Sequence, residues 1–103
     1  MTVPTTAFKV LTAQQWTDFE RERVFHGAPV DIEDGYIHLS TADQLEATIA
    51  KYFAGHGCLM IAEVDLVHLG DAVRWEPARG GDLFPHVYAA LPIEAVVSLQ
   101  QRN

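Results

Sequence analysis

A chain of 103 residues, of which 49% are hydrophobic and 20% charged, has the length and composition of one globular domain. Its 14 acidic and 7 basic residues give a net charge of −7, and the basic residues are scattered along the sequence. Because binding to nucleic-acid phosphates needs a basic face, we expect no nucleic-acid partner. Cys58 is the only cysteine; it forms no intrachain disulfide, and we expect it to be buried and inert.

The sequence also argues against a membrane protein. No apolar run approaches the roughly 20 residues that a membrane-spanning helix needs. The first residues, MTVPTTAFKVL, lack the basic and apolar regions of a signal peptide. We therefore expect a cytoplasmic protein without a membrane partner, and its oligomeric state stays open.

The first third of the chain predicts a strand, a helix and a loop. Residues 7–12 (AFKVLT) are typical of a strand. Thr12 and Gln15 have the spacing of a capping box, which predicts a helix that ends near Arg23. The apolar side chains on its buried face are Trp16 and Phe19. Residues 24–35 show no period and contain Gly, Pro and Asp at intervals, which indicates a loop with at most one turn of helix.

A second strand and helix follow. Residues 36–40 (YIHLS) alternate between polar and apolar side chains, as in a strand with one buried face. The polar face carries Tyr36, His38 and Ser40. Ser40 or Thr41 can cap the next helix, and we interpret Ser40 first as that cap. Apolar residues within 45–53 recur at helical spacing, and Gly55 supplies the stop.

The remaining segments predict four strands. They are residues 58–66, 72–76, 86–89 and 95–100, joined by turns and by a glycine-containing loop at 77–82. The first of them is apolar enough to be a central strand. The order β-α-β-α-β-β-β-β predicts an α+β fold: one domain over residues 1–103, with two helices packed on a mostly antiparallel sheet that is either continuous or split.

Three predicted strands each carry two polar side chains on one face. They are His38 with Ser40, Arg74 with Glu76, and His86 with Tyr88. If the three faces lie on the same side of the sheet, all six converge beside the N-terminus of the second helix, where anions are attracted. The sequence then predicts a cleft for a small ligand with a phosphate, a carboxylate or a sugar diphosphate. No histidine pair has the spacing of a common metal site, so we expect no metal.

Each of these residues also has a structural interpretation. His38 and His86 can hydrogen-bond to backbone groups of a half-buried sheet, and Tyr88 can belong to the core with its hydroxyl at the rim. Arg74 and Glu76 can form a solvated ion pair, worth about 0–1 kcal/mol. The functional interpretation depends on the combination of the six residues.

Three blocks of the chain carry a resemblance to a known family. DGYIHLSTADQL (34–45), AVRWEP (72–77) and LFPHVYAALPIEAV (83–96) resemble the signatures of the bacterial domain-of-unknown-function family 952. The resemblance covers about residues 7–99 and departs at Ala89, where the family usually has glycine. Members of that family resemble the ADP-ribosylation fold of NAD-dependent ADP-ribosyltransferases and tRNA 2′-phosphotransferases.

The resemblance implies NAD as a candidate cofactor, with the cofactor itself left open, and a role for three residues. His38 would bind the ribose of NAD, Ser40 would support the nicotinamide, and Glu76 would take the catalytic position that stabilises an oxocarbenium-like transition state. Glu76 departs from the usual pattern because it precedes Pro77 and lacks the glutamine or glutamate element before it. Three functions stay open: an enzyme that acts on NAD or an ADP-ribose-like ligand, a non-catalytic module that binds a small anion, and a structural or interaction domain.

Overall fold

Residues 4–102 are described by the structure, a computed structural model. The first half contains β1 (Thr6–Thr12), α1 (Ala13–Glu22), β2 (Val24–Phe25), α2 (Pro29–Asp34), β3 (Ile37–His38) and α3 (Ala42–Tyr52). The second half contains β4 (Leu59–Asp65), α4 (Leu66–Leu69), η1 (Gly70–Ala72), β5 (Val73–Ala78), η2 (Arg79–Gly81), β6 (Asp82–Val87), β7 (Leu91–Pro92), η3 (Ile93–Ala95) and β8 (Val96–Arg102). These elements form one α+β domain.

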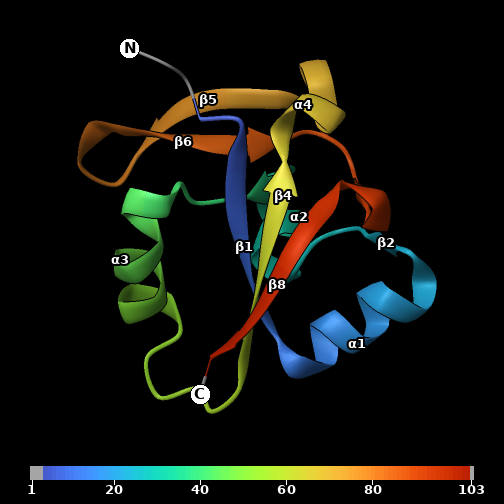
Figure 1. The fold of residues 1–103 in the computed structure, drawn as a ribbon. Coiled ribbons are helices and arrows are strands. Elements are labelled where there is room, and N and C mark those ends of the chain that lie inside the picture. Colours follow the sequence, from blue (N-terminus) through green and yellow to red (C-terminus); the bar gives the residue numbers. More distant parts are fainter. Residues whose placement is uncertain (1–3, 103) are drawn as a thin grey trace.

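The strands form separate antiparallel sheets, so the split form of the predicted sheet is the observed one. One sheet has the order β1-β4-β8, a second has the order β3-β6-β5, and β2 pairs with β7. Figure 1 shows β5 and β6 crossing over the ends of β1 and β4, with α3 and α1 on opposite sides of the first sheet. Two hydrogen bonds between the backbones of Phe8 and Ser40, 2.7 and 2.9 Å long, join the two larger sheets.

The first helix forms as its sequence predicts. Thr12 Oγ1 accepts a hydrogen bond from the Gln15 N–H at 3.1 Å, and Gln15 Oε1 accepts one from the Thr12 N–H at 2.9 Å. This capping box satisfies two backbone donors that the helix leaves open. Arg23 ends the helix in the left-handed region, with a φ of 68°, and its N–H donates to the Phe19 carbonyl.

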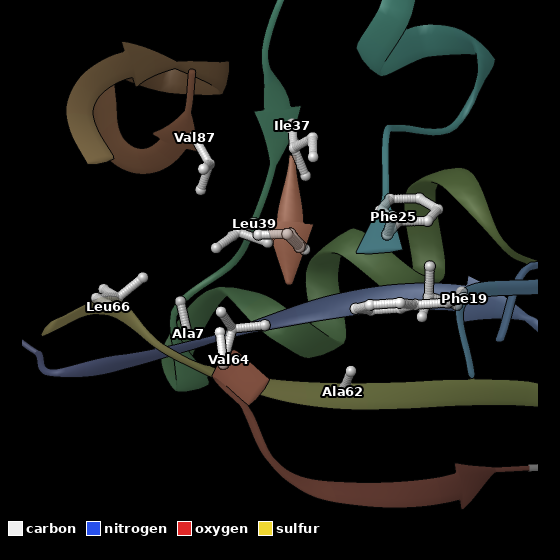
Figure 2. Close-up of a cluster of buried hydrophobic side chains, with 12 residues drawn as sticks. Ala7, Phe19, Phe25, Ile37, Leu39, Ala62, Val64, Leu66 and Val87 are labelled. Carbon is white, nitrogen blue, oxygen red and sulfur yellow. The ribbon is translucent and has the colours of Figure 1, made fainter. Parts of the chain in front are cut away.

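The main core lies between the two larger sheets and α1. Figure 2 shows Ala7 and Val64 of the first sheet facing Leu39 and Val87 of the second. A second cluster beneath α3 contains Val10, Leu45, Leu59 and Ile61. Strand β1 therefore buries both of its faces.

Several sequence predictions are corrected by the structure. Cys58 is exposed rather than buried, because it precedes the first residue of β4 and lies in the turn after Gly57. The segment 24–35, predicted as a loop with at most one turn of helix, contains the short strand β2 and the six-residue helix α2. The turn predicted after residue 66 is the short helix α4, which Asp65 caps by accepting a hydrogen bond from the Val67 N–H.

Strand β3 is shorter than predicted. It pairs with β6 only at Ile37 and His38, and the chain then crosses to β1 at Ser40. Ser40, where the chain leaves one sheet for the other, ends the regular ladder. No helix within residues 4–102 is long and apolar enough to cross a membrane.

Candidate functional site

The second sheet brings three of the predicted polar faces together. His38 of β3 lies opposite His86 of β6, and His86 lies opposite Arg74 of β5. Side chains directly opposite each other in an antiparallel pair are close enough to interact. Five of the six candidates, namely His38, Arg74, Glu76, His86 and Tyr88, therefore lie on one face, which we call the polar face.

Tyr36 connects these residues, although the sequence did not single it out. Its ring stacks on that of His86, with centroids 4.1 Å apart, and lies 4.7 Å from His38 and 5.2 Å from Tyr88. The rings of His38 and His86 are 5.4 Å apart in an edge-to-face arrangement. The alternation of residues 36–40 had already placed Tyr36 on the polar side of the strand, so the signal was present.

Glu76 forms hydrogen bonds with two other residues of the polar face, His86 and Tyr88. Its Oε1 accepts a hydrogen bond from His86 Nδ1 at 2.8 Å and another from the Tyr88 hydroxyl at 2.7 Å. These two bonds lower the pKa of Glu76, and the bond to Glu76 raises the pKa of Tyr88. The guanidinium of Arg74 lies over the Tyr88 ring, with Cζ 4.9 Å from its centroid.

A buried carboxylate orients His38. His38 Nδ1 lies 2.7 Å from Asp31 Oδ1, and His38 Nε2 lies 3.0 Å from Asp34 Oδ2. Asp31 is only 2% exposed, yet it forms an ion pair at 3.0 Å with Lys9, which is itself 6% exposed. A carboxylate that holds the Nδ1 of a histidine fixes the orientation of the ring.

The environment of Asp31 keeps it ionised. Its oxygens also accept hydrogen bonds from the N–H groups of Ala28 and His38 at 2.7 and 3.1 Å. Burial acts to raise the pKa of Asp31, but the hydrogen bond from His38 and the charge of Lys9 outweigh it and lower this pKa to about 2. Sequence reasoning missed Lys9 and Asp31; the lysine within the apolar run AFKVL was the available signal.

Ser40 lies away from the polar face. It is 4% exposed, and its Oγ lies 2.8 Å from Thr48 Oγ1 of α3. The N-cap of α3 is Thr41 rather than Ser40, and the Thr41 N–H donates to Gln44 Oε1 at 3.0 Å. Ser40 is the residue at which the chain passes from one sheet to the other, and its hydroxyl is used inside the protein.

An open pocket adjoins the polar face. It has a volume of about 290 Å³ and is lined by His26, Asp31, Ile32, Gly35, Tyr36, Ile37, Val87, Tyr88 and Ala89. Tyr36 and Tyr88 therefore belong both to the ring cluster and to the pocket wall. Within residues 4–102, no three His, Cys, Asp or Glu side chains are arranged to hold a metal ion.

Comparison with known proteins places the chain in a family. The model of the family described as Protein of unknown function (DUF952) matches residues 10–99. The chain belongs to this family. The X-ray crystal structure of protein CC0527 from Caulobacter crescentus is similar, with a TM-score of 0.93 and 35% identity over 96% of this chain and 87% of that one.

The solution NMR structure of CC0527 agrees with it, with a TM-score of 0.83 and 36% identity over 94% of this chain and 84% of that one. No curated protein matches this DUF952 domain. The family and the fold are thus shown.

Because the pKa of Asp31 is lowered in the folded protein, the free energy of unfolding of this DUF952 domain depends on pH in the acidic range. Because the pKa of Asp31 is about 2 in the folded protein and near 3.8 otherwise, its ionisation stabilises the fold above pH 4. We expect about 2 kcal/mol of this stability to be lost as the pH falls from 5 to 2.

Denaturant unfolding at pH 5, 4, 3 and 2 measures this loss, with Asp31→Asn as the control that cannot titrate. The difference in unfolding free energy between the wild type and this variant is expected to shrink toward pH 2. A constant difference over that range would contradict the assigned pKa.

Proposed function

We propose that the polar face and its pocket bind a small molecule of the NAD or ADP-ribose class, in which an aromatic ring, a ribose and phosphates occur together. The observation that carries this proposal is the cluster of Tyr36, His38, His86 and Tyr88, with each histidine held at Nδ1 by a carboxylate. Convergent polar groups beside a pocket are typical of a ligand site. The resemblance to the ADP-ribosylation fold that the sequence blocks imply supports the same ligand class as part of this proposal.

Each exposed group suits one part of such a ligand. Aromatic rings stack on tyrosine, and Tyr88 is 41% exposed beside the pocket. Ribose hydroxyls hydrogen-bond to histidines, so we assign the ribose to His38, whose side chain is 33% exposed, with a hydroxyl replacing the exposed Asp34 carboxylate at His38 Nε2. Phosphates need a cation, and the exposed Arg74 at the edge of the polar face supplies it. Ser40 has no ligand contact in this arrangement.

In the enzymatic form of the proposal, Glu76 stabilises positive charge. The bond between C1′ of the ribose and the ring nitrogen of nicotinamide breaks, and its electron pair leaves with neutral nicotinamide. C1′ becomes oxocarbenium-like until a nucleophile, water or an acceptor hydroxyl, forms the new bond and loses its proton. A carboxylate placed beside C1′ stabilises this charge. Glu76 is the partly exposed carboxylate among the proposed ligand contacts.

One observation favours binding without turnover. Glu76 Oε1 already accepts two hydrogen bonds, from His86 and from the Tyr88 hydroxyl. Both bonds stabilise the negative charge of Glu76 in the free protein. The Glu76 carboxylate therefore interacts less strongly with the positive charge that develops at C1′ in the transition state. A non-catalytic module that binds the same ligand is therefore the second candidate function.

The first test is ligand-induced stabilisation. We expect NAD or ADP-ribose to raise the melting temperature of the wild type and of the control His56→Ala, whose exposed histidine lies outside the polar face. His38→Ala is expected to bind at least about 10-fold more weakly, because it removes a hydrogen-bonding group that a carboxylate has oriented. If no ligand shifts the wild type and His38→Ala melts well below it, the polar face is structural and the proposal is wrong.

The second test separates the enzyme from the binding module. Prolonged incubation with NAD is expected to release nicotinamide, and Glu76→Gln is expected to lower that rate by about 100-fold or more while binding changes little. Glutamine keeps the size of the side chain and an oxygen for the Tyr88 hydroxyl. Measurable binding without released nicotinamide would establish the non-catalytic module instead.

A further inference from the structure

Two partly exposed carboxylates lie on or directly beside the polar face. The side chains of Asp34 and Glu76 are 41% and 35% exposed. The third carboxylate, Asp31, is buried and paired with Lys9, so these two charges offset each other. Among the described side chains of this face, Arg74 is the permanent cation that remains. A ligand whose charge is only negative would meet this cation together with two carboxylates.

The position of Arg74 indicates what the Tyr88 ring can bind. Its guanidinium lies over the ring face at 4.9 Å, and within residues 4–102 no hydrogen bond or ion pair under 4.0 Å fixes it. The attraction of Glu76 and of the ring therefore holds it in place. Because the Tyr88 hydroxyl donates to a carboxylate, its ring is electron-rich, and this strengthens the attraction of its face for a cation.

We propose that the face of Tyr88, together with Glu76, is the subsite for a planar aromatic cation of the N-alkylpyridinium class, and that the Arg74 guanidinium occupies this subsite in the free protein. The proposal rests on the proposed function and deepens it. When the ligand binds, its cationic ring replaces the guanidinium, and Arg74 becomes free to bind the phosphates of the same ligand. The oxidised form of a nicotinamide ring carries this charge, whereas the reduced form is neutral.

The replacement needs little free energy. An exposed cation–π contact is worth about 0.5–1 kcal/mol, so release of Arg74 from the Tyr88 ring opposes binding by only about 2- to 5-fold. A pyridinium is planar and weakly hydrated, as a guanidinium is, and it can contact the ring over its whole face. Arg74 then has opposite effects on the two parts of the ligand: it competes with the cationic ring and attracts the phosphates.

The two opposite effects of Arg74 can be tested by measuring binding affinities with calorimetry. The three probes are the N-methylnicotinamide cation, neutral nicotinamide, and ADP-ribose. We expect the wild type to prefer the cation over nicotinamide by about 5-fold. Arg74→Ala is expected to bind the cation about 2- to 5-fold more tightly and ADP-ribose more weakly. Tyr88→Leu is expected to lose the preference for the cation. Arg21→Ala, which removes an exposed arginine on α1, is the matched control and should leave every affinity unchanged.

The outcomes distinguish this inference from the proposed function. If ADP-ribose binds while the cation and nicotinamide bind equally, the proposed function stands and the cation subsite is wrong. The inference is also overturned if Arg74→Ala weakens the cation and ADP-ribose alike. If the cation binds with the expected preference while ADP-ribose and NAD do not, the subsite is supported and the assigned ligand class is wrong. If no probe binds, both proposals fail.

Discussion

Replacement of Asp31 by alanine is expected to lower the free energy of unfolding by about 3–5 kcal/mol. The variant leaves the ammonium group of Lys9 buried, and among the described residues its remaining hydrogen-bond acceptor is the His38 carbonyl at 3.1 Å. It also removes the acceptor of the Ala28 N–H and of the His38 ring. A buried charge without its partner is destabilising because the protein interior cannot replace the lost hydration. Urea denaturation at pH 7 measures the effect.

Two further variants separate this effect from a general loss of negative charge. Asp34→Ala removes a carboxylate that also contacts His38 but is 41% exposed, and we expect its unfolding free energy to change by less than about 1 kcal/mol. The double variant Lys9→Met with Asp31→Leu removes both buried charges and is expected to recover most of the stability. A double variant as unstable as Asp31→Ala would show that the hydrogen bonds around Asp31, not its pairing with Lys9, stabilise the fold.

Phe19→Ala is expected to cost about 3–5 kcal/mol of unfolding free energy, because it leaves a cavity where the core is closed on all sides. Phe19 is 1% exposed, and its ring lies 5.5 Å from the rings of both Trp16 and Phe25. Phe19 of α1 therefore packs against Phe25 of β2 and belongs to the main core cluster. Thermal and chemical unfolding monitored by tryptophan fluorescence measure the loss, since Trp16 contacts the site of the change.

The control for Phe19→Ala is Val67→Ala, which shortens an apolar side chain that is 72% exposed. We expect it to change the stability by no more than about 0.5 kcal/mol. Equal losses for the two variants would mean that the buried Phe19, which Figure 2 shows within the core cluster, contributes no more to stability than an exposed side chain.

Much of the polar face followed from alternation within short segments. The side chains of a strand point to alternate faces, so the pairs His38 with Ser40, Arg74 with Glu76, and His86 with Tyr88 were assigned from neighbouring residues, and of these residues Ser40 lies off the shared face. What the sequence did not contain was the order β3-β6-β5, which makes His86 the neighbour of both His38 and Arg74. Pairing between distant strands depends on packing over the whole domain.

Ser40 shows where local reasoning ends. Its position before a helix favours an N-cap, and its place in the alternating segment favours the polar face. The backbone of Ser40 instead pairs with Phe8, and its hydroxyl meets Thr48. Both contacts connect segments that only the folded chain brings together, so no local pattern predicts them.

The sequence by itself determined the helices α1 and α3, the strands with clear alternation, the α+β class and the family, because each depends on local propensity or on motifs within one segment. Only the tertiary structure decided that the sheet is split, that Cys58 is exposed, and that Lys9 and Asp31 form a buried pair that orients His38. The physical reason is that burial and pairing are properties of groups far apart in the chain. Their free energies depend on which groups the fold places together.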